Sequence, residues 1–590
     1  MGLVTRAVVT NVHNLVGVFH RAATLNRLSC VTRALRHPPK ENYPSMTKVL
    51  CCIFGCTILS LASISSPAQV AVATYHNDNY RSGANTSETT LTAANVNVQS
   101  FGKVLTLPVQ GYVYAQPLYV PGVSIGGQLH DVLYVATEHL QVYAFDAQSG
   151  QQLWHNSFMQ DLAFGSVMPV TSMEVSCDDL IPEVGITGTP VIDLSTNIMY
   201  LVTKVKILQK ITQSVSYQQI LHGLDITTGA DAIMPHRISA RVPGSGNGSD
   251  GGYITFDPLV ESQRPALLLQ KGQVFVSFAS HCDLGDYHGY LMAFDAATLN
   301  PTGVWASTPN GEDGGYWASG AGPAADSSGD IYFGSGNGDF TANDDGIDYG
   351  DSIVRFNWSN NNISVVDYFT PWDQDTLNFY DTDLGSGGVL LLPDQPGAPI
   401  PHLLVQVGKE GTIDLINRDD MGQFNPSGDS QIVQTLPYQL NAVFGMPAFW
   451  NNFVYFGASS DSFEAYSYDP VAQQLSTNYT SRSPGVFSFP GGVPSISSNG
   501  TLNGIAWIIE THGFRDGSSA ILHAYNAYDL SKELYNSKQN PDRDQAGPAV
   551  KFSVPTIADG LVFVGAAGEV DVYGLLTSKA PQGGSRPAGH

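Results

Sequence analysis

Charged residues are scarce in this 590-residue sequence, at 13%, and cations are the scarcer kind: 27 Lys and Arg stand against 52 Asp and Glu. The formal net charge is −25. A surface this acidic repels phosphate backbones and anionic lipid, which argues against a nucleic-acid partner and against a membrane partner for the mature chain. Sparse charge together with 60 glycines also disfavours a fold built from surface helices and favours many tight turns.

Several sequence signals of other protein classes are missing. No C-x-x-C-H motif occurs, so we expect no covalently attached c-type haem. No nucleophile motif supports Ser-His-Asp hydrolysis. No long stretch with helical periodicity follows the N-terminal region. The composition therefore points to an all-β chain.

The N-terminus has a different composition from the rest. Residues 49–73 carry no charge, follow Lys48 and end in small residues, which is the layout of a secretory signal peptide. The preceding residues form a basic leader, or the true start is Met46. We expect residues 1–73 to be leader plus signal peptide, cleaved near 68–73, and the protein to be periplasmic or secreted. The alternative is an uncleaved membrane anchor.

Cysteine usage agrees with export. Four of the six cysteines lie in the segment expected to be removed, which leaves Cys177 and Cys282. In an oxidising compartment two remaining cysteines favour one disulfide, worth about 4–5 kcal/mol for a loop of this length. Free thiols, or a metal shared with His281 and His288, are the alternatives.

A repeated unit organises the chain after the signal peptide. Residues 131–154 contain two short strands rich in β-branched and aromatic residues, joined by a polar turn. The second strand ends in Asp146 and Gly150, which suit a tight turn, and Trp154 follows. Degraded copies recur at about fifty to eighty residues, giving eight units in all. Most copies are preceded by one more strand with a proline near its start.

Four strands in each of eight units predict an eight-bladed β-propeller of antiparallel blades, a single domain over residues 74–576. The last unit stops after its third strand, while residues 101–109 form a strand with no unit of its own. Pairing these ends would close the ring and remove an exposed edge. The Gly/Pro-rich residues 577–590 are expected to be a disordered tail.

The long loops predict where a site lies. Connections between units gather on one face of a propeller, and here they are long. Turns from different units, including 281–283, 337–351 and 409–410, should meet near the axis. We expect a small-molecule, glycan or protein ligand on this loop-rich face.

The residues of the first unit also carry a resemblance to a known family. Residues 144–154, A-F-D-A-Q-S-G-Q-Q-L-W, resemble the tryptophan-docking motif of the pyrroloquinoline quinone (PQQ) dehydrogenases, whose fold is an eight-bladed propeller. Four later segments, 283–290, 332–337, 371–383 and 409–418, are similar to family segments in the family's order. The chain is identified as a divergent PQQ-repeat propeller.

The resemblance implies roles for particular residues. Asp283 and Asn337 would bind calcium, and one of Asp373, Asp375 and Asp383 would be the catalytic carboxylate. The implied cofactor-binding residues are Lys409, Glu410, Trp317 and Cys177. Calcium would polarise the quinone while the carboxylate takes the proton of a substrate hydroxyl.

The sequence departs from the family pattern at the implied site. The family's adjacent cysteines would fall at Cys177 and Asp178, so one is missing, and Glu410 replaces an asparagine. A Cys177–Cys282 bond would lie at the pocket and either replace the family's cysteine ring or block the quinone. We therefore expect an exported propeller with a degenerate cofactor pocket that serves as a ligand- or protein-binding scaffold; the alternative is a PQQ- and calcium-dependent oxidoreductase acting on an alcohol or sugar.

Overall fold

The computed structural model describes residues 70–163 and 165–576, which belong to a compact unit, Ser65–His590. The basic leader, nearly all of the predicted signal peptide and the predicted tail lie outside the described residues. The described helices are short: α1 (Gln374–Tyr380), α2 (Pro541–Asp544), and the 3-10 turns η1 (Ala318–Gly320), η2 (Ala342–Asp344), η3 (Leu384–Ser386), η4 (His512–Arg515) and η5 (Ser537–Gln539). None of the helices in this part of the chain is long and apolar enough to cross a bilayer. The all-β prediction is confirmed.

Antiparallel sheets make up the first half of the unit. The first contains β3 (Leu118–Ile125), β4 (Gln128–Thr137), β5 (Gln141–Asp146) and β6 (Gln152–Ser157). The second contains β7 (Gln160–Asp161), β8 (Gly165–Thr171), β9 (Glu183–Val184), β10 (Val191–Asp193), β11 (Ile198–Gln209), β12 (Val215–Asp225) and β13 (Asp231–Arg237). A hairpin of β14 (Arg241–Pro243) and β15 (Tyr253–Thr255) precedes the third, β16 (Glu261–Ser262), β17 (Leu268–Gln270), β18 (Gln273–Ser280), β19 (Tyr290–Asp295) and β20 (Pro301–Ala306).

The second half continues the pattern. The fourth sheet holds β21 (Ala324–Ala325), β22 (Ile331–Gly334), β23 (Ile353–Ser359), β24 (Asn362–Thr370) and β28 (Gln423–Phe424); the fifth holds β25 (Leu390–Leu391), β26 (Leu403–Val407), β27 (Ile413–Asn417) and β29 (Gln434–Leu436). The sixth holds β30 (Ala448–Trp450), β31 (Phe453–Gly457), β32 (Asp461–Asp469), β33 (Gln474–Leu475) and β34 (Ser481–Phe487). The seventh holds β1 (Ala84–Asn85), β35 (Ser495–Asn499), β36 (Leu502–Glu510), β37 (Ile521–Asn526) and β38 (Asp529–Asn536); the last holds β2 (Phe101–Tyr112), β39 (Thr556–Ala558), β40 (Leu561–Gly565) and β41 (Ala567–Leu575).

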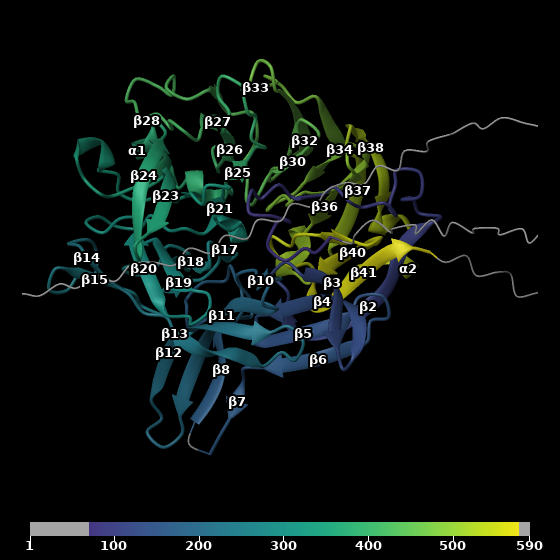
Figure 1. Ribbon diagram of the computed structural model, residues 1–590, viewed down its shortest axis with the longest axis horizontal. Coiled ribbons are helices and arrows are strands. Elements are labelled where there is room, and N and C mark those ends of the chain that lie inside the picture. The colour runs from purple at the N-terminus through teal and green to yellow at the C-terminus, as the bar shows by residue number, and fades with distance from the viewer. Residues whose placement is uncertain (1–69, 164, 577–590) are drawn as a thin grey trace, which may run out of the picture. The chain divides into compact units, whose positions relative to one another are not determined.

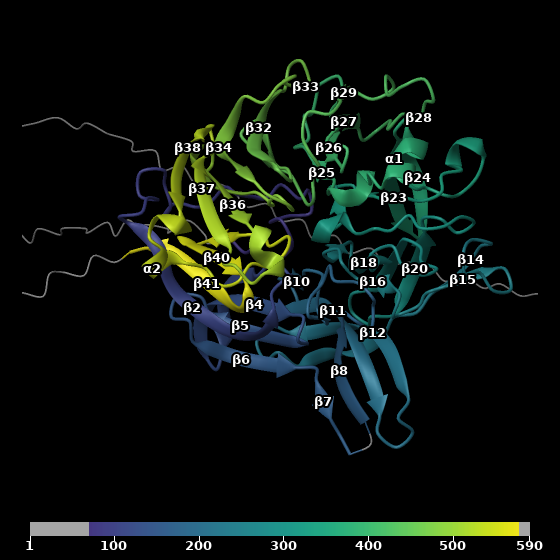
Figure 2. The same cartoon turned by 180° about the vertical axis from the view of Figure 1, so that it is seen from behind.

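The sheets of this unit follow one another in chain order around a circle, as Figure 1 shows and Figure 2 repeats from behind. The propeller prediction is therefore confirmed. Within the last sheet the strands come from both ends of the unit, because β2 pairs antiparallel with β41 and places Phe101 opposite Leu575. In Figure 1 the yellow β41 lies beside the blue β2.

The predicted number of blades and their uniform four-strand plan need correction. The propeller has seven blades instead of the predicted eight. The described residues form eight sheets of four or more strands, so the number of sheets exceeds the number of blades. Loop segments add strands to several sheets: β1 pairs parallel with β35, and β28 pairs parallel with β24. The sheet of β11 departs furthest from a blade, since β7, β8 and β9 extend it to seven strands.

A repeated contact joins neighbouring sheets. The indole of Trp154 donates a hydrogen bond to the carbonyl of Ile226 at 2.9 Å, and a side chain at Gly229 would come within 2.5 Å of its ring. Tyr134 donates to the same carbonyl at 3.1 Å. Equivalent bonds to the following sheet are Tyr200 to Ala296 (2.9 Å), Tyr455 to Ala527 (2.8 Å) and Trp450 to Gly500 (2.9 Å). In three pairs of sheets, the turn at Ile226, Ala296 or Ala527 thus accepts a hydrogen bond from a tyrosine of the preceding sheet.

The described structure begins inside the range predicted for signal-peptide cleavage. Val72 is fully buried, and it exchanges backbone hydrogen bonds with Tyr119 at 2.8 and 3.0 Å. Ala73 accepts a hydrogen bond from the backbone of Ile192 at 2.8 Å. A cut near residue 68 keeps these contacts, whereas a cut after residue 73 removes them.

Candidate functional site

Loops from most of the sheets enclose a cavity of about 400 Å³, which we call the central cavity. Its size falls in the range of small-molecule sites. Five residues singled out from the sequence line it: Cys177, Cys282, Asp283, Trp317 and Lys409. The other lining residues are Asp179, Leu180, Ser262, Arg264, Ala279, Ser280, His281, Asp381, Phe444, Phe489, Lys551 and Phe552.

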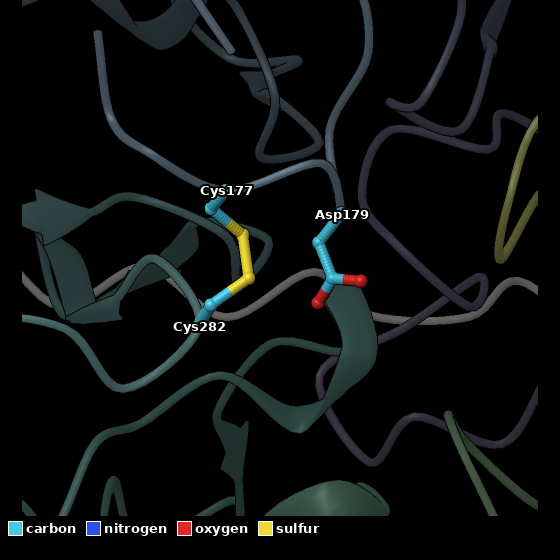
Figure 3. A group of neighbouring side chains, drawn as sticks. All are labelled: Cys177, Asp179 and Cys282. Atoms are coloured by element: carbon cyan, nitrogen blue, oxygen red, sulfur yellow. A yellow bond between two sulfur atoms is a disulfide. The ribbon is translucent and has the colours of Figure 1, made fainter. Parts of the chain in front are cut away.

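A disulfide forms part of the cavity wall. The sulfur atoms of Cys177 and Cys282 are 1.99 Å apart, and their Cα atoms are 5.7 Å apart. Figure 3 shows the bridge with the Asp179 carboxylate beside it. Cys282 and Asp283 both have left-handed backbone angles, with φ of 54° and 51°. Such strain in residues other than glycine is held in place by the surrounding structure, and here the bridge fixes the turn that presents Asp283.

Aromatic rings form a second part of the wall. Phe444 lies 6.2 Å from Trp317 and stacks on Phe552 at 5.9 Å, measured between ring centres. Two ammonium groups face these rings: Lys409 is 5.5 Å from the centre of Trp317, and Lys551 is 4.9 Å from the centre of Phe552. Aromatic faces next to cations suit a flat anionic ligand, because the rings stack on it and the cations pair with its charge.

Arg264 is the third cation of the central cavity, and its charge is not neutralised by an ion pair. Only 7% of the residue is exposed, and its guanidinium carbon lies 5.2 Å and 5.3 Å from the centres of the Tyr114 and Phe552 rings. Within the described residues no carboxylate comes within ion-pairing distance of Arg264, whereas Lys551 pairs with Asp179 at 2.7 Å. Burial lowers the pKa of Arg264 because desolvation disfavours its charged form.

Lys409 connects the cavity to two aspartates. Its ammonium contacts Oδ1 of Asp381 at 2.6 Å and also contacts Asp383. Burial alone would lower the pKa of Lys409, but Asp383 and Asp381 raise it above its ordinary value, so the side chain stays charged. Asp383 is 5% exposed and also accepts a hydrogen bond from the backbone of Asn337 at 2.9 Å. The close approach requires glycine at 336, where a Cβ would lie 2.4 Å from Oδ1 of Asp383.

Asn337 and Asp283 have the donor chemistry of a cation site. Oδ1 of Asn337 is buried without a hydrogen-bond partner, while its amide nitrogen donates to Asp381 at 2.9 Å. Partial burial and then the charge of Asp383 raise the pKa of Asp283. A hard cation prefers such oxygen ligands. It would give Oδ1 of Asn337 a partner and would stabilise the charged form of Asp283.

The carboxylates here do not converge on one point. In the described part of the chain, one trio of potential metal-binding Cys, His, Asp and Glu side chains has ligand atoms within 4.8 Å of one another: Cys177, Asp179 and Cys282. Both sulfurs of that trio are in the disulfide, which removes them as metal ligands. A cation at Asp283 would therefore depend on Asn337 and Asp383 together, in competition with Lys409.

The remaining predicted site residues are not brought to the central cavity. Asp373 and Glu410 line a second, smaller cavity. Asp375 is exposed on α1 and lines neither of these cavities. Of the three aspartates proposed for catalysis, Asp383 is the one that contacts Lys409 and Asn337.

Sequence inspection missed the residues that set the charge and shape of the central cavity. These residues are Arg264, Lys551, Phe444 and Phe552, and none of them lies in a segment that resembles the family. Arg264 stands before Pro265 at the start of a repeat strand, so the sequence marks it only as part of that pattern.

Solved structures with a similar fold include quinohemoprotein alcohol dehydrogenases and a methanol dehydrogenase. The quinohemoprotein alcohol dehydrogenase of Comamonas testosteroni aligns with a TM-score of 0.56 and 15% identity over 88% of this chain and 83% of its own. A quinohemoprotein alcohol dehydrogenase of Pseudomonas putida HK5 gives 0.54 and 14% over 88% and 82%. A europium-containing methanol dehydrogenase gives 0.52 and 13% over 87% and 99%. At these identities the likeness shows a shared propeller fold.

No protein-family model matches the sequence, and no curated protein matches it significantly.

Proposed function

We propose that this protein is a quinoprotein-dehydrogenase-like propeller that binds a flat anionic small molecule in the central cavity, with PQQ as the first candidate. Arg264 is the observation that carries the proposal. A nearly buried guanidinium without a carboxylate partner costs free energy, and a ligand carboxylate would offset that cost. A group with a shifted pKa at the wall of a cavity is a candidate for contact with a ligand.

The residues of the cavity fit PQQ. PQQ is a flat, fused-ring tricarboxylate, and the cavity offers Trp317, Phe444 and Phe552 for stacking. Arg264, Lys409 and Lys551 provide positive charge at separate places on the wall. The Cys177–Cys282 bridge adds an apolar surface at the position where the sequence comparison expected the family's cysteine ring. These features support binding of PQQ in the central cavity.

Retention of the quinone by the purified protein tests this proposal. After incubation with PQQ and rapid gel filtration, the protein fraction should carry the absorbance of about one quinone per chain. Citrate, a tricarboxylate without a flat ring, should not displace it at the same concentration. Loss of all quinone on the column, or equal displacement by citrate, would count against a site for flat anions.

A second candidate function is a PQQ- and calcium-dependent oxidoreductase acting on an alcohol or sugar. The contact of Asp383 with Asn337 favours it: the backbone N–H of Asn337 donates to the buried Asp383 carboxylate, and the side-chain Oδ1 of the same asparagine has no hydrogen-bond partner. Asp283, Asn337 and Asp383 would hold calcium, and bound PQQ would supply the electron acceptor. Asp383 would accept the proton of the substrate hydroxyl, and Lys409 would hold that carboxylate in place. Dye-coupled oxidation of alcohols and sugars after reconstitution with PQQ and calcium tests this candidate.

Two further parts of the proposal concern assembly and location. The pairing of β2 with β41 supports a ring closed between its ends. The disulfide supports folding in an oxidising compartment, in agreement with an exported, periplasmic or secreted protein. Mass spectrometry of the native protein tests this. Cleavage near residue 70 should give a mature chain that lacks the leader.

A further inference from the structure

A second cavity, of about 160 Å³, lies beside the central one and has a different chemistry. Four carboxylates line it, from Asp373, Glu410, Asp414 and Asp429, and we call it the acidic pocket. No Lys, Arg or His is among its lining residues. The other lining residues are Pro371, Trp372, Leu377, Thr382, Leu384, Gly408, Thr412, Thr435, Pro437 and Tyr438. Like charges gathered in a partly buried space destabilise one another unless a cation or protons join them.

Asp414 is the clearest sign that the acidic pocket accommodates a ligand. It lies inside β27, opposite Gln406 on one neighbouring strand and Thr435 on the other, and is only 3% exposed. Its Oδ1 is buried and has no hydrogen-bond partner. A carboxylate in the middle of a blade strand is costly, and an unpartnered oxygen adds to that cost.

The other three carboxylates are anchored around the same space. Burial raises the pKa of Asp373 and of Glu410, and the charge of Asp373 raises that of Glu410 further. Glu410 accepts a further hydrogen bond from Thr412 at 2.6 Å, and Asp429 accepts one from the backbone of Trp372 at 2.9 Å. Burial, followed by the neighbouring carboxylates, raises the pKa of Asp414 to about 8 and that of Asp429 to about 6. The groups are therefore fixed, close together and short of positive charge.

The spacing of these oxygens distinguishes a metal ion from an organic cation. A bare divalent ion draws its oxygen ligands to within about 2.3–2.6 Å of itself. In the described residues, no three of these four carboxylates bring oxygens within 4.8 Å of one another. Trp372 and Tyr438, which are 51% and 68% exposed, add two aromatic faces to the lining. A cation that is wider than a metal ion and partly apolar matches both features.

We propose that the acidic pocket binds a small organic ammonium ion, such as a protonated primary amine, with its charged end toward Asp414 and its carbon chain against Trp372 and Tyr438. The site is separate from the central cavity: neighbouring residues divide between the two, with Lys409 lining the central cavity and Glu410 lining the acidic pocket. Binding here does not depend on whether the central cavity takes PQQ.

Isothermal titration calorimetry with ethylammonium chloride tests the proposal, at constant ionic strength set with potassium chloride. We expect saturable binding of one ethylammonium per chain, at least tenfold tighter than calcium. Affinity should increase from pH 5 to pH 8, because the cation displaces the proton held among Asp373, Glu410, Asp414 and Asp429, which face one another and the phenol of Tyr438.

Two matched variants make the test specific. Glu410→Gln removes one charge at a half-buried turn and should weaken ethylammonium binding at least tenfold. Asp375→Asn, on the exposed face of α1 and outside the pocket, should bind like the wild type. Tighter binding of calcium than of ethylammonium, equal binding by the two variants, or no saturable binding would overturn the proposal. The thermal unfolding midpoint of Glu410→Gln, compared with that of Asp375→Asn, shows whether the variant is folded.

Discussion

The guanidinium carbon of Arg264 lies 5.3 Å from the centre of the Phe552 ring, although the two residues are far apart in the chain. The contact holds a charged plane against an aromatic plane at the wall of the central cavity. The guanidinium is therefore fixed before any ligand arrives, which lowers the entropy cost of binding one.

Loss of the disulfide should destabilise the protein substantially. The bridge closes a loop with a sequence separation of 105 residues, for which chain entropy predicts about 4–5 kcal/mol. Cys177→Ser and Cys282→Ser should each lower the midpoint of urea unfolding, and the double variant should match the single ones because one bond is lost in every case. Reductant should bring the wild type to the same midpoint. A wild type that is insensitive to reductant, with variants of undiminished stability, would show that the bridge contributes nothing.

Trp154 should contribute to stability through its contact with the next sheet. Trp154→Ala removes the hydrogen bond to Ile226 and the packing on Gly229, and should cost about 2–4 kcal/mol. Trp372→Ala is the matched control, since Trp372 is 51% exposed and makes no such contact between sheets. Thermal unfolding should separate the two variants by several degrees, and equal midpoints would refute the structural role of the Trp154 contact.

Stability should depend on pH through Asp414. Its pKa is about 8 in the folded protein, against an ordinary value of 3.8, so folding takes up a proton between these values. The stabilisation is present at low pH and is lost as the pH rises toward 8, at about 1.4 kcal/mol per pH unit for one proton. Asp414→Asn should therefore flatten the decline in unfolding free energy between pH 5 and pH 8. Parallel pH curves for Asp414→Asn and the wild type would contradict this assignment.

Asp383 should separate binding from catalysis. Asp383→Asn keeps the shape of the side chain and removes its charge, so PQQ retention should remain within a fewfold of the wild type. If the protein oxidises alcohols or sugars, the same variant should lose at least 100-fold in kcat, as expected when a general base is removed. Asp375→Asn should change neither property. Retained turnover in Asp383→Asn would exclude Asp383 as the base.

The sequence predicted the fold through its turns. The Asp146, Gly150 and Trp154 pattern identified the repeat, and Trp154 makes the sheet-to-sheet contact that such a pattern implies. The count of blades failed where loop segments became strands, as β7 and β8 did on β11. Those segments are short and pair far from their neighbours in the chain, so local periodicity does not reveal them.

The sequence predicted some residues of the central cavity correctly and placed others wrongly. Cys282, Asp283 and Lys409 lie on turns, where the family resemblance aligned them with a pocket, and they line the central cavity. Glu410 follows Lys409 directly in the turn between β26 and β27, yet it lines the acidic pocket instead of the central cavity. Arg264 lies in the loop between β16 and β17, and Asp414 lies inside β27. The residues that line the two cavities with them come from distant parts of the chain, which no pattern within one segment specifies.

Binding of PQQ by the wild type and by Arg264→Leu, measured side by side by isothermal titration calorimetry, tests the central claim most directly. A charge-assisted hydrogen bond is worth about 1.5–3 kcal/mol, so Arg264→Leu should bind at least tenfold more weakly. Arg264→Lys, which keeps the charge, should lie between them, and Arg241→Leu should match the wild type, because Arg241 stacks on Tyr253 outside the cavity. The result that would contradict a ligand site at Arg264 is equal affinity in the wild type and Arg264→Leu, or no binding by the wild type.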